Sequence, residues 1–327
     1  MAVGTGASDR PGPSAGARFP ASLLHTAATL YYLQDATQAE VAAALGTSRA
    51  TVSRLLQEAR TRGIVRIEVI DPARADTTEL AEELRVRLGL TSVRICASAP
   101  AGHVADAVSP VLAELLGEVG LGRDDVMIVS SGRTMHDVAR RPLPSLPGVV
   151  VAPMVGGQDE PEPWYQTNEI TRRVAAGLGG VPRFLFAPAM PGPELRRGLM
   201  TDPSIRRVFE LWADAKVALM GVGAPPLLRA SIPGFVPTGE APLRRSVGDV
   251  SSRFYDADGV EVTYEGGERL IACPLEILRD KEIGIAVAYG AEKVPSILGG
   301  VRGRYFTHLV TDPETAGLLL AEAPPAD

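Results

Sequence analysis

Residues 37–66 read TQAEVAAALGTSRATVSRLLQEARTRGIVR, a pattern that predicts a helix, a tight turn and a second helix, followed by a strand. Thr37 and Glu40 lie three residues apart, the spacing of a capping box in which a hydroxyl and a carboxylate accept hydrogen bonds from free backbone N–H groups. Gly46 permits the sharp turn, and Ser48 can cap the second helix. We therefore expect a helix-turn-helix in this segment.

The second helix of this segment is predicted to bury one side. Its apolar residues recur at i, i+3, i+4 and i+7, so they form a single stripe: Val52, Leu55, Leu56 and Ala59. Gly63 is suited to end the helix. Polar side chains near the start of the helix point away from the stripe, where they can enter a major groove and contact bases and phosphates. The candidate DNA-binding residues are Gln38, Ser48, Arg49, Thr51, Ser53, Arg54 and Gln57.

The same segment is basic, although the chain as a whole is acidic. Residues 37–66 contain five arginines and two glutamates, a formal charge of +3, whereas all 327 residues together carry −6. A local positive patch on an acidic protein is typical of a DNA-binding module joined to a domain that does not bind DNA. An ordinary helical hairpin with a solvated basic face could carry the same charge. The caps, the turn and the charge together favour double-stranded DNA as a partner.

Length and composition exclude several classes of protein. A chain of 327 residues is long enough for two domains. Its two cysteines, Cys96 and Cys273, match no metal or redox spacing and predict a reducing compartment without disulfides. The four histidines share no ligand spacing, so no metal site is expected. No signal-peptide pattern occurs, and no apolar run approaches about 18 residues, which predicts a cytoplasmic protein that does not span a membrane.

Composition divides the chain into four parts. Residues 1–18 are rich in Gly, Pro, Ser and Ala without periodic hydrophobicity, and are predicted to be a disordered tail. Residues 19–70 form the predicted helix-turn-helix domain, in which a first helix over SLLHTAATLYYLQ packs against the other two and IVRIEVI forms a strand. The polar residues 71–80 are the expected linker. Residues 81–327 form the second, larger domain.

The larger domain is predicted to be doubly wound α/β. From Thr91 onward, short apolar runs alternate with helical segments, the pattern of a mostly parallel sheet covered by helices on both faces. The predicted strands are SVRICA, DVMIVS, VVVAPMV, RFLFAPA, VALMGVG, VSSRFYDA, IACPL, IGIAVAYG and THLVT. The helices predicted between them cover residues 104–118, 166–178, 204–213, 291–301 and 313–321.

Turns after the predicted strands carry candidate ligand-binding residues, because ligands of doubly wound sheets bind where the carboxyl end of a strand leads into a helix. Residues 130–134 combine small residues, hydroxyls, a helix start and the charge of Arg133, a phosphate cradle by type. Gly221 and Gly223 permit close backbone approach, but no third glycine completes a dinucleotide motif, so no nicotinamide or flavin cofactor is expected. Lys293 in the first turn of a helix favours a bound anion. The candidate effector-binding residues are Ser131, Gly132, Arg133, Thr134, Gln158, Gly221, Gly223 and Lys293.

No catalytic residues are predicted, because no nucleophile, base and orienting group can be joined by spacing. Asp249, Asp256 and Glu276 could act as acid or base groups, but carboxylates at strand ends are usually caps or turn residues. An isomerase or deaminase of sugar phosphates, with the N-terminal helices as an oligomerisation arm, is the alternative prediction. A DNA-binding module attached to a ligand-free structural domain is a third.

Four segments, which lie between about residues 23 and 320, give the chain a resemblance to a known family. They are LYYLQDATQAEVAAALGTSRATVSRLLQEARTRGIVRIEV, SSGRTM, VGDVSSRFYDADG and GAEKVPSILGGVRGRYFTHLVTDPETA. In these segments the chain resembles the SorC family of sugar-binding bacterial transcriptional regulators, which is related to the DeoR type. The resemblance implies a DNA-binding regulator controlled by a sugar or sugar-phosphate effector, in a homodimer or homotetramer on a palindromic operator. It also implies an effector domain similar in fold to glucosamine-phosphate deaminase and ribose-phosphate isomerase.

The resemblance can be carried to individual positions. Residues 131–134 correspond to the phosphate-contacting turn of the family, and Lys293 corresponds to the lysine after a late glycine. Arg133 stands where phosphosugar-binding relatives often have a small hydroxylated residue, and Ser252 stands where a glycine is usual. In such a regulator, an effector alters transcription only if it binds DNA-competent and DNA-incompetent arrangements with different affinity.

Overall fold

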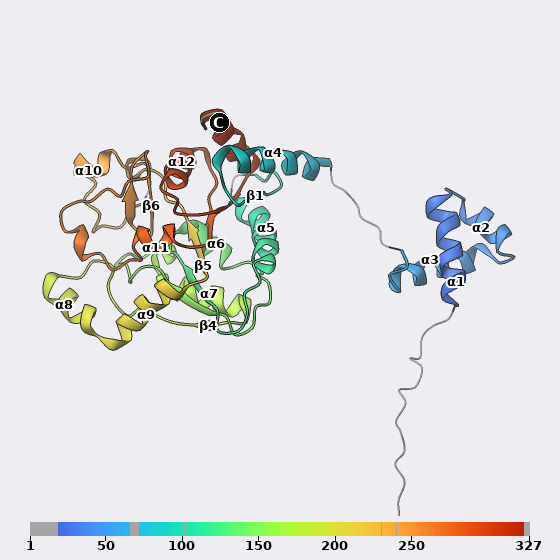
Figure 1. The fold of residues 1–327 in the computed structure, drawn as a ribbon, viewed down its shortest axis with the longest axis horizontal. Helices are drawn as coiled ribbons and strands as arrows, with labels where there is room; N and C mark the ends of the chain where they lie inside the picture. Colours follow the sequence, from blue (N-terminus) through green and yellow to red (C-terminus); the bar gives the residue numbers. More distant parts are fainter. Residues whose placement is uncertain (1–18, 66–71, 101, 230, 240, 324–327) are drawn as a thin grey trace, which may run out of the picture. The chain divides into compact units, whose positions relative to one another are not determined.

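A computed structural model describes residues 19–65, 72–100, 102–229, 231–239 and 241–323 of the chain (Figure 1). Contacts divide the chain into two units, residues 1–70 and 71–327, and each is described by itself. The predicted tail over residues 1–18 lies outside the described residues, as does most of the predicted strand IVRIEVI. No helix within the described ranges is long and apolar enough to cross a membrane.

The first unit is a bundle of helices around a small apolar core. It contains α1 (Ala21–Ala28), continued by a π-helical turn (Thr29–Leu33), then α2 (Gln38–Ala44) and α3 (Arg49–Thr61). Both α1 and α2 pack on α3, so the predicted helix-turn-helix is confirmed. In α1, Leu24 is fully buried, and the neighbouring Leu23 is partly buried against the same core.

Local hydrogen bonds confirm the predicted helix starts. The backbone N–H of Thr37 donates to Glu40 Oε2 at 2.8 Å, and the N–H of Glu40 donates to Thr37 Oγ1 at 3.3 Å, which completes the capping box. Ser48 caps α3. Gly46 adopts φ +61° in the turn between α2 and α3, a conformation that costs glycine little. The predicted apolar stripe is buried as expected: Val52, Leu55, Leu56 and Ala59.

The second unit contains a seven-stranded parallel sheet in the order β1-β9-β8-β5-β2-β3-β4. The predicted fold class, a helix-turn-helix followed by a mostly parallel α/β domain, is therefore confirmed. The strands are β1 (Ser92–Ile95), β2 (Val126–Val129), β3 (Val150–Pro153), β4 (Val181–Pro182), β5 (Val217–Gly221), β8 (Ile283–Val287) and β9 (His308–Thr311).

Helices cover both faces of this sheet. One core contains apolar side chains of α4 (Pro72–Leu88), α9 (Pro203–Asp214), α11 (Leu275–Arg279), α12 (Val294–Arg302) and α13 (Pro313–Glu322). The other core contains those of α5 (Val104–Glu118), α6 (Arg133–Val138) and α7 (Thr167–Leu178). Central strands are buried on both faces, which explains their continuous apolar runs. The remaining helices are α8 (Pro193–Thr201) and the short α10 (Ala241–Arg244).

Three predicted strands differ from the observed structure. RFLFAPA is a loop after the two-residue β4, since Phe186 is 78% exposed and Pro182 and Pro188 cannot donate ladder hydrogen bonds. VSSRFYDA is divided into an antiparallel hairpin of β6 (Gly248–Val250) and β7 (Arg253–Tyr255), because Ser251 and Ser252 form its turn with positive φ. IACPL forms only an isolated bridge, between Val155 and Ala272.

The expected linker also differs. Residues 72–80, which we predicted to be part of a polar linker, belong to α4. Pro72 is the first residue of this helix, a position where the missing N–H and the fixed φ of proline are compatible with helical geometry.

Candidate functional site

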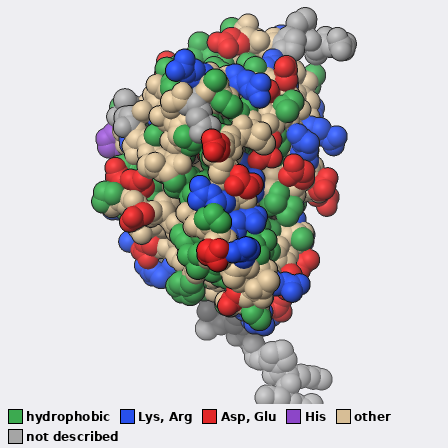
Figure 2. Space-filling view, turned by 90° about the vertical axis from the view of Figure 1, so that its left-hand side faces the viewer, with side chains coloured by type: hydrophobic (Ala, Val, Ile, Leu, Met, Phe, Trp, Pro, Cys, Tyr) green, Lys and Arg blue, Asp and Glu red, His purple; other side chains and the backbone are tan. Residues whose placement is uncertain are grey.

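Helix α3 presents the predicted DNA-binding side chains to solvent. Arg49, Ser53, Arg54 and Gln57 are exposed, on the side away from the buried stripe. The Nε of Arg54 donates to the carbonyl of Ala50 at 3.3 Å, which holds the start of its guanidinium group close to the helix. Figure 2 shows a face of the second unit, on which acidic, basic and hydrophobic side chains are interspersed.

The other three predicted DNA-binding residues are Ser48 and Thr51, which form the cap of α3, and Gln38. The Oγ of Ser48 accepts a hydrogen bond from the backbone N–H of Thr51 at 3.2 Å, and the two hydroxyls lie 3.0 Å apart. Gln38 is the first residue of α2 and is half-buried. A contact of Ser48 or Thr51 with DNA would therefore come in addition to the helix cap.

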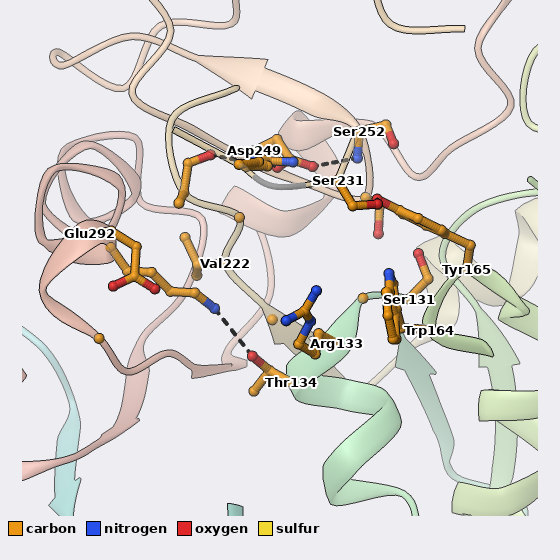
Figure 3. Close-up of a pocket in the computed structure, with 18 of the residues that line it drawn as sticks. Ser131, Arg133, Thr134, Trp164, Tyr165, Val222, Ser231, Asp249, Ser252 and Glu292 are labelled. Carbon is orange, nitrogen blue, oxygen red and sulfur yellow. Dashed lines mark hydrogen bonds and ion pairs between the residues drawn. The ribbon is translucent and has the colours of Figure 1, made fainter. Parts of the chain in front are cut away.

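The second unit contains a cavity of about 600 Å³, at the carboxyl ends of the central strands (Figure 3). It lies among the turn from β2 into α6, the end of β5, the β6–β7 hairpin and the turn from β8 toward α12. All eight predicted effector-binding residues line it, although they come from four separate parts of the chain. They are Ser131, Gly132, Arg133, Thr134, Gln158, Gly221, Gly223 and Lys293.

The turn from β2 into α6 is held by neighbouring segments. Gly132 has φ +108°, and its N–H donates to the carbonyl of Trp164 at 2.9 Å. Ser130 Oγ accepts a hydrogen bond from the N–H of Gly221 at 2.9 Å, which ties the turn to the end of β5. The guanidinium carbon of Arg133 lies 4.5 Å from the centre of the Trp164 ring, a cation–π contact.

Lys293 reaches the same turn from the other side of the cavity. Its Nζ donates to Thr134 Oγ1 at 3.1 Å. The pKa of Lys293 is lowered to about 8, chiefly by burial. Glu292 and Asp249 oppose this change, and the positive charges of Arg229 and Arg133 contribute to it. An anion that binds beside Lys293 would restore the charged form, since it adds a favourable charge to a site that penalises an isolated ammonium.

An ion pair that the sequence did not reveal lies at the edge of the cavity. Arg229 and Asp249 are in direct contact, and the Nε of Arg229 also donates to the carbonyl of Ala224 at 2.6 Å. Asp249 Oδ2 accepts the N–H of Ser252 at 2.7 Å. Both carboxylate oxygens of Asp249 therefore already have protein partners. We had considered Asp249 as an acid or base group, and these partners explain it as a structural residue of the hairpin.

Aromatic side chains, which we did not select either, complete the wall. Trp164 and Tyr165 line the cavity, and the hydroxyl of Tyr165 lies 2.9 Å from Ser231 Oγ. Tyr289 lines the opposite part, where Lys293 Nζ lies 5.8 Å from its ring centre. The aromatic pair WY directly precedes the predicted helix over residues 166–178, but nothing in that pattern indicates a ligand, so its role depends on the tertiary structure.

Two polar atoms of residues in the cavity wall have no hydrogen-bond partner among the described residues. Gln158 Nε2 donates to Ser131 Oγ at 3.1 Å, whereas Gln158 Oε1 is buried without a hydrogen bond. The hydroxyl of Ser251 is buried in the same state. Both atoms are closed off from solvent, so a ligand could bond to them only after the side chain rotates. The cavity therefore combines cations, hydroxyls and aromatic faces.

Comparison with known proteins gives two family matches along the chain. The model of a sugar-binding domain family matches residues 74–321. The model of a Crp-like helix-turn-helix domain matches residues 21–74. The two matches cover the two units of the chain separately.

Curated relatives match both units together. The sorbitol operon regulator of Klebsiella pneumoniae is 32% identical over 305 residues, which cover 90% of this chain and 96% of the relative. The deoxyribonucleoside regulator of Bacillus subtilis is 33% identical over 301 residues, which cover 90% and 96%. The crystal structure of the full-length sorbitol operon regulator SorC from Klebsiella pneumoniae superposes with a TM-score of 0.71 and covers 91% of this chain and 98% of that one.

Proposed function

Because the chain belongs to the SorC family of sugar-binding transcriptional regulators, we propose that α3 carries its operator-contacting surface and that the cavity at the sheet edge holds its effector. The chain is a DNA-binding transcriptional regulator that responds to a sugar or phosphosugar. The alternative, a sugar-phosphate isomerase or deaminase, is not supported, because the relatives are transcriptional regulators.

The proposed operator surface consists of the residues that α3 exposes at its start. Arg49 and Arg54 supply positive charge for phosphates or for the guanine edge, and Ser53 and Gln57 supply hydrogen-bonding groups on the same side. A cap at Ser48 orders the first turn of α3, so the side chains that would enter a groove start from a defined backbone. We include Gln38, Ser48 and Thr51 in the proposed surface.

One observation supports the proposed effector site above all others. The eight residues selected as effector-binding come from four parts of the chain, and they line a single cavity. The cavity offers hydroxyls to a polyol, aromatic faces to the apolar side of a sugar ring, and Lys293 to an anionic group. These features fit a sugar or sugar phosphate.

We propose that the regulator acts as a homodimer or homotetramer. Two recognition helices in a dimer must match half-sites about 10 bp apart or at multiples of that spacing, so a small rigid-body shift between subunits would misplace the second helix. The effector needs only a differential affinity for the two arrangements, typically ~1–3 kcal/mol. We also propose that the protein is cytoplasmic, because it acts on transcription.

Salt-titrated binding of the full chain to duplexes from its own promoter tests this function. The measurement is repeated with a panel of sugars, polyols and their phosphates, and we expect at least one compound to change the operator affinity fivefold or more, as a coupling of ~1 kcal/mol requires. A thermal-shift screen of the same panel should identify the same compound, because a ligand selective for the folded state raises Tm. Indifference of both DNA affinity and Tm to every compound would count against the proposal.

We also propose that the cavity binds its effector without transforming it. Asp249 is paired with Arg229 and with the N–H of Ser252, and this leaves it poorly placed as a general base. Incubation of the purified chain with ribose and hexosamine phosphates tests this statement directly. Turnover of either class of compound would show that the protein is an isomerase or deaminase. Recovery of the intact compound after prolonged incubation would support a protein that only binds its effector.

A further inference from the structure

Arg133 is one of two cations in the cavity that form no ion pair with a described carboxylate, and the other is Lys293. Its guanidinium lies against Trp164, and within the parts of the chain that the structure describes no acidic side chain is at ion-pair distance from it. Figure 3 shows Arg133 beside Ser131 and Trp164, with Asp249 on a separate segment. Arg133 is also exposed within the open cavity, so its donors are accessible to a ligand.

The other charges of the cavity are accounted for. Asp249 is held by Arg229 and by the N–H of Ser252, so neither member of that pair is available to Arg133. Glu292 is exposed and follows Gly290 on the segment of Lys293, whose charge it partly offsets. Because Arg229 and Asp249 pair with each other, the charged side chains that remain in the cavity are Arg133, Lys293 and Glu292, a formal charge of +1.

Arg133 and Lys293 offer two different anion sites in one cavity. Lys293 is a compact ammonium on the segment between β8 and α12, and it lies next to the hydroxyl of Thr134, a pair suited to a phosphate. The guanidinium carbon of Arg133 lies 4.5 Å from the ring centre of Trp164, and the N–H donors of a guanidinium form a planar fork. Such a fork matches a carboxylate or a phosphate bidentately, so a bisphosphate probe distinguishes the two.

We propose that the effector carries two anionic groups, a phosphate held by Lys293 and Thr134 and a carboxylate held by Arg133, and is therefore a phosphorylated sugar acid. This inference rests on the proposed function, because it assigns a class of ligand to the proposed effector cavity. Arg133 is then the residue that selects an acid over an aldose or a polyol.

Matched pairs of probes test the inference on the full chain. Gluconate 6-phosphate and glucitol 6-phosphate differ only in a carboxylate against a hydroxymethyl group at C1, and 3-phosphoglycerate and glycerol 3-phosphate form the same pair on a shorter skeleton. We expect calorimetric titration to show the acid of at least one pair binding tenfold or more tightly than its alcohol. In Arg133→Gln the preference should disappear while the affinity for the alcohol phosphate stays within twofold.

Two further variants keep the result interpretable. Arg207→Gln removes an exposed arginine of α9 that does not line the cavity, so it should keep the tenfold preference. Arg133→Lys keeps the charge without the fork and should retain only part of the preference. The wild-type ratio needs no variant, so misfolding of Arg133→Gln would not remove the test.

Each outcome decides the inference. Absence of a preference for the acid in both pairs, failure of all four probes to bind, or an unchanged preference in Arg133→Gln would overturn it. A bisphosphate that binds as tightly as the phosphorylated acid would also overturn the assignment of a carboxylate. If a neutral sugar or a monophosphate then alters operator binding, the proposed function stands without this inference, whereas indifference to every compound removes both.

Discussion

Arg229 and Asp249 pair directly across Gly223, and a methyl group on that glycine would collide with both side chains. The N–H of Gly223 donates to the carbonyl of Asp249 at 2.9 Å, so the strand end and the β6–β7 hairpin lie as close as two backbones can. The ion pair thereby joins the end of β5 to the hairpin that forms one wall of the cavity. Several measurable consequences follow from this and from the other contacts described above.

Gly223→Ala should damage the cavity wall, because its Cβ needs the space that Asp249 and Arg229 occupy. We expect a loss of ~1–3 kcal/mol in the free energy of unfolding and a weaker response to the effector. Gly198→Ala on the exposed side of α8 is the matched control, since its Cβ would meet no atom nearby and alanine favours a helix. Equal Tm values for the two variants would contradict the crowding at Gly223.

Ser252→Gly should stabilise the second unit. Ser251 and Ser252 both have positive φ, 52° and 66°, in the two-residue turn between β6 and β7. A left-handed conformation costs a residue with a side chain about 1 kcal/mol relative to glycine, so the variant should raise the free energy of unfolding by about that amount. Ser204→Gly at the first turn of α9 should instead lower it. Urea unfolding followed through Trp164 and Trp212 measures both variants.

Anion binding at the cavity should depend on the charge of Lys293. Since burial lowers the pKa of this residue to about 8, the empty protein loses the charge as pH rises through about 8, and affinity for an anionic effector should fall about tenfold between pH 7 and pH 9. Calorimetric titration at the two pH values checks this. Lys293→Arg stays charged throughout and should lose the pH dependence. An identical decline in that variant would assign the titration to another group.

The same shift predicts how the stability of the empty protein varies with pH. The unfolded chain keeps Lys293 protonated up to its ordinary pKa near 10.4, whereas the folded chain releases the proton near 8. Between these values the unfolded state binds more protons, so the contribution of Lys293 to stability increases as pH rises from about 8. Comparison of wild type with Lys293→Met by urea unfolding at pH 7 and pH 10 isolates this contribution. If wild type lost more stability than Lys293→Met between pH 7 and pH 10, the result would contradict this prediction.

Arg54→Ala should weaken operator binding and leave effector binding unchanged. Arg54 is exposed on α3, in the unit that does not contain the cavity. If the arginine contacts a phosphate, the slope of log K against log salt should decrease by about 1, and if it reads a guanine the loss should be ~1–3 kcal/mol at one base pair. Arg207→Ala on α9 is the control. Equal loss of DNA and effector binding in Arg54→Ala would indicate misfolding.

Ser48 and Ser53 separate a structural from a recognition role on the same helix. Ser48 accepts the N–H of Thr51, so Ser48→Ala should destabilise α3 by ~1 kcal/mol and accelerate exchange of its amide hydrogens. Ser53 is exposed, and Ser53→Ala should leave exchange unchanged while it alters operator affinity. Hydrogen exchange of the full chain and DNA binding together check the pair. Unchanged exchange in Ser48→Ala would contradict the capping role.

Local patterns were sufficient for the helix-turn-helix and for most of the sheet. The capping box of Thr37 and Glu40, the stripe through Leu55 and the apolar run at Ile128 each act within a few residues, so periodicity and side-chain chemistry predict them. The prediction of a strand over RFLFAPA was wrong for the same reason, because it too relied on a local pattern. An apolar run indicates burial, but whether Phe186 finds a neighbouring segment to pack against depends on residues far away in the sequence.

The sequence by itself identified turns whose residues line the cavity, because each of those turns is a local signal at the end of a strand. Only the tertiary structure decided that Thr134 and Lys293, 159 residues apart, share one hydrogen bond. It also brought Trp164 under Arg133 and paired Arg229 with Asp249. The physical reason is that parallel strands place their carboxyl ends at one edge of the sheet, so side chains distant in the chain meet there, and no spacing along the sequence records which of them touch.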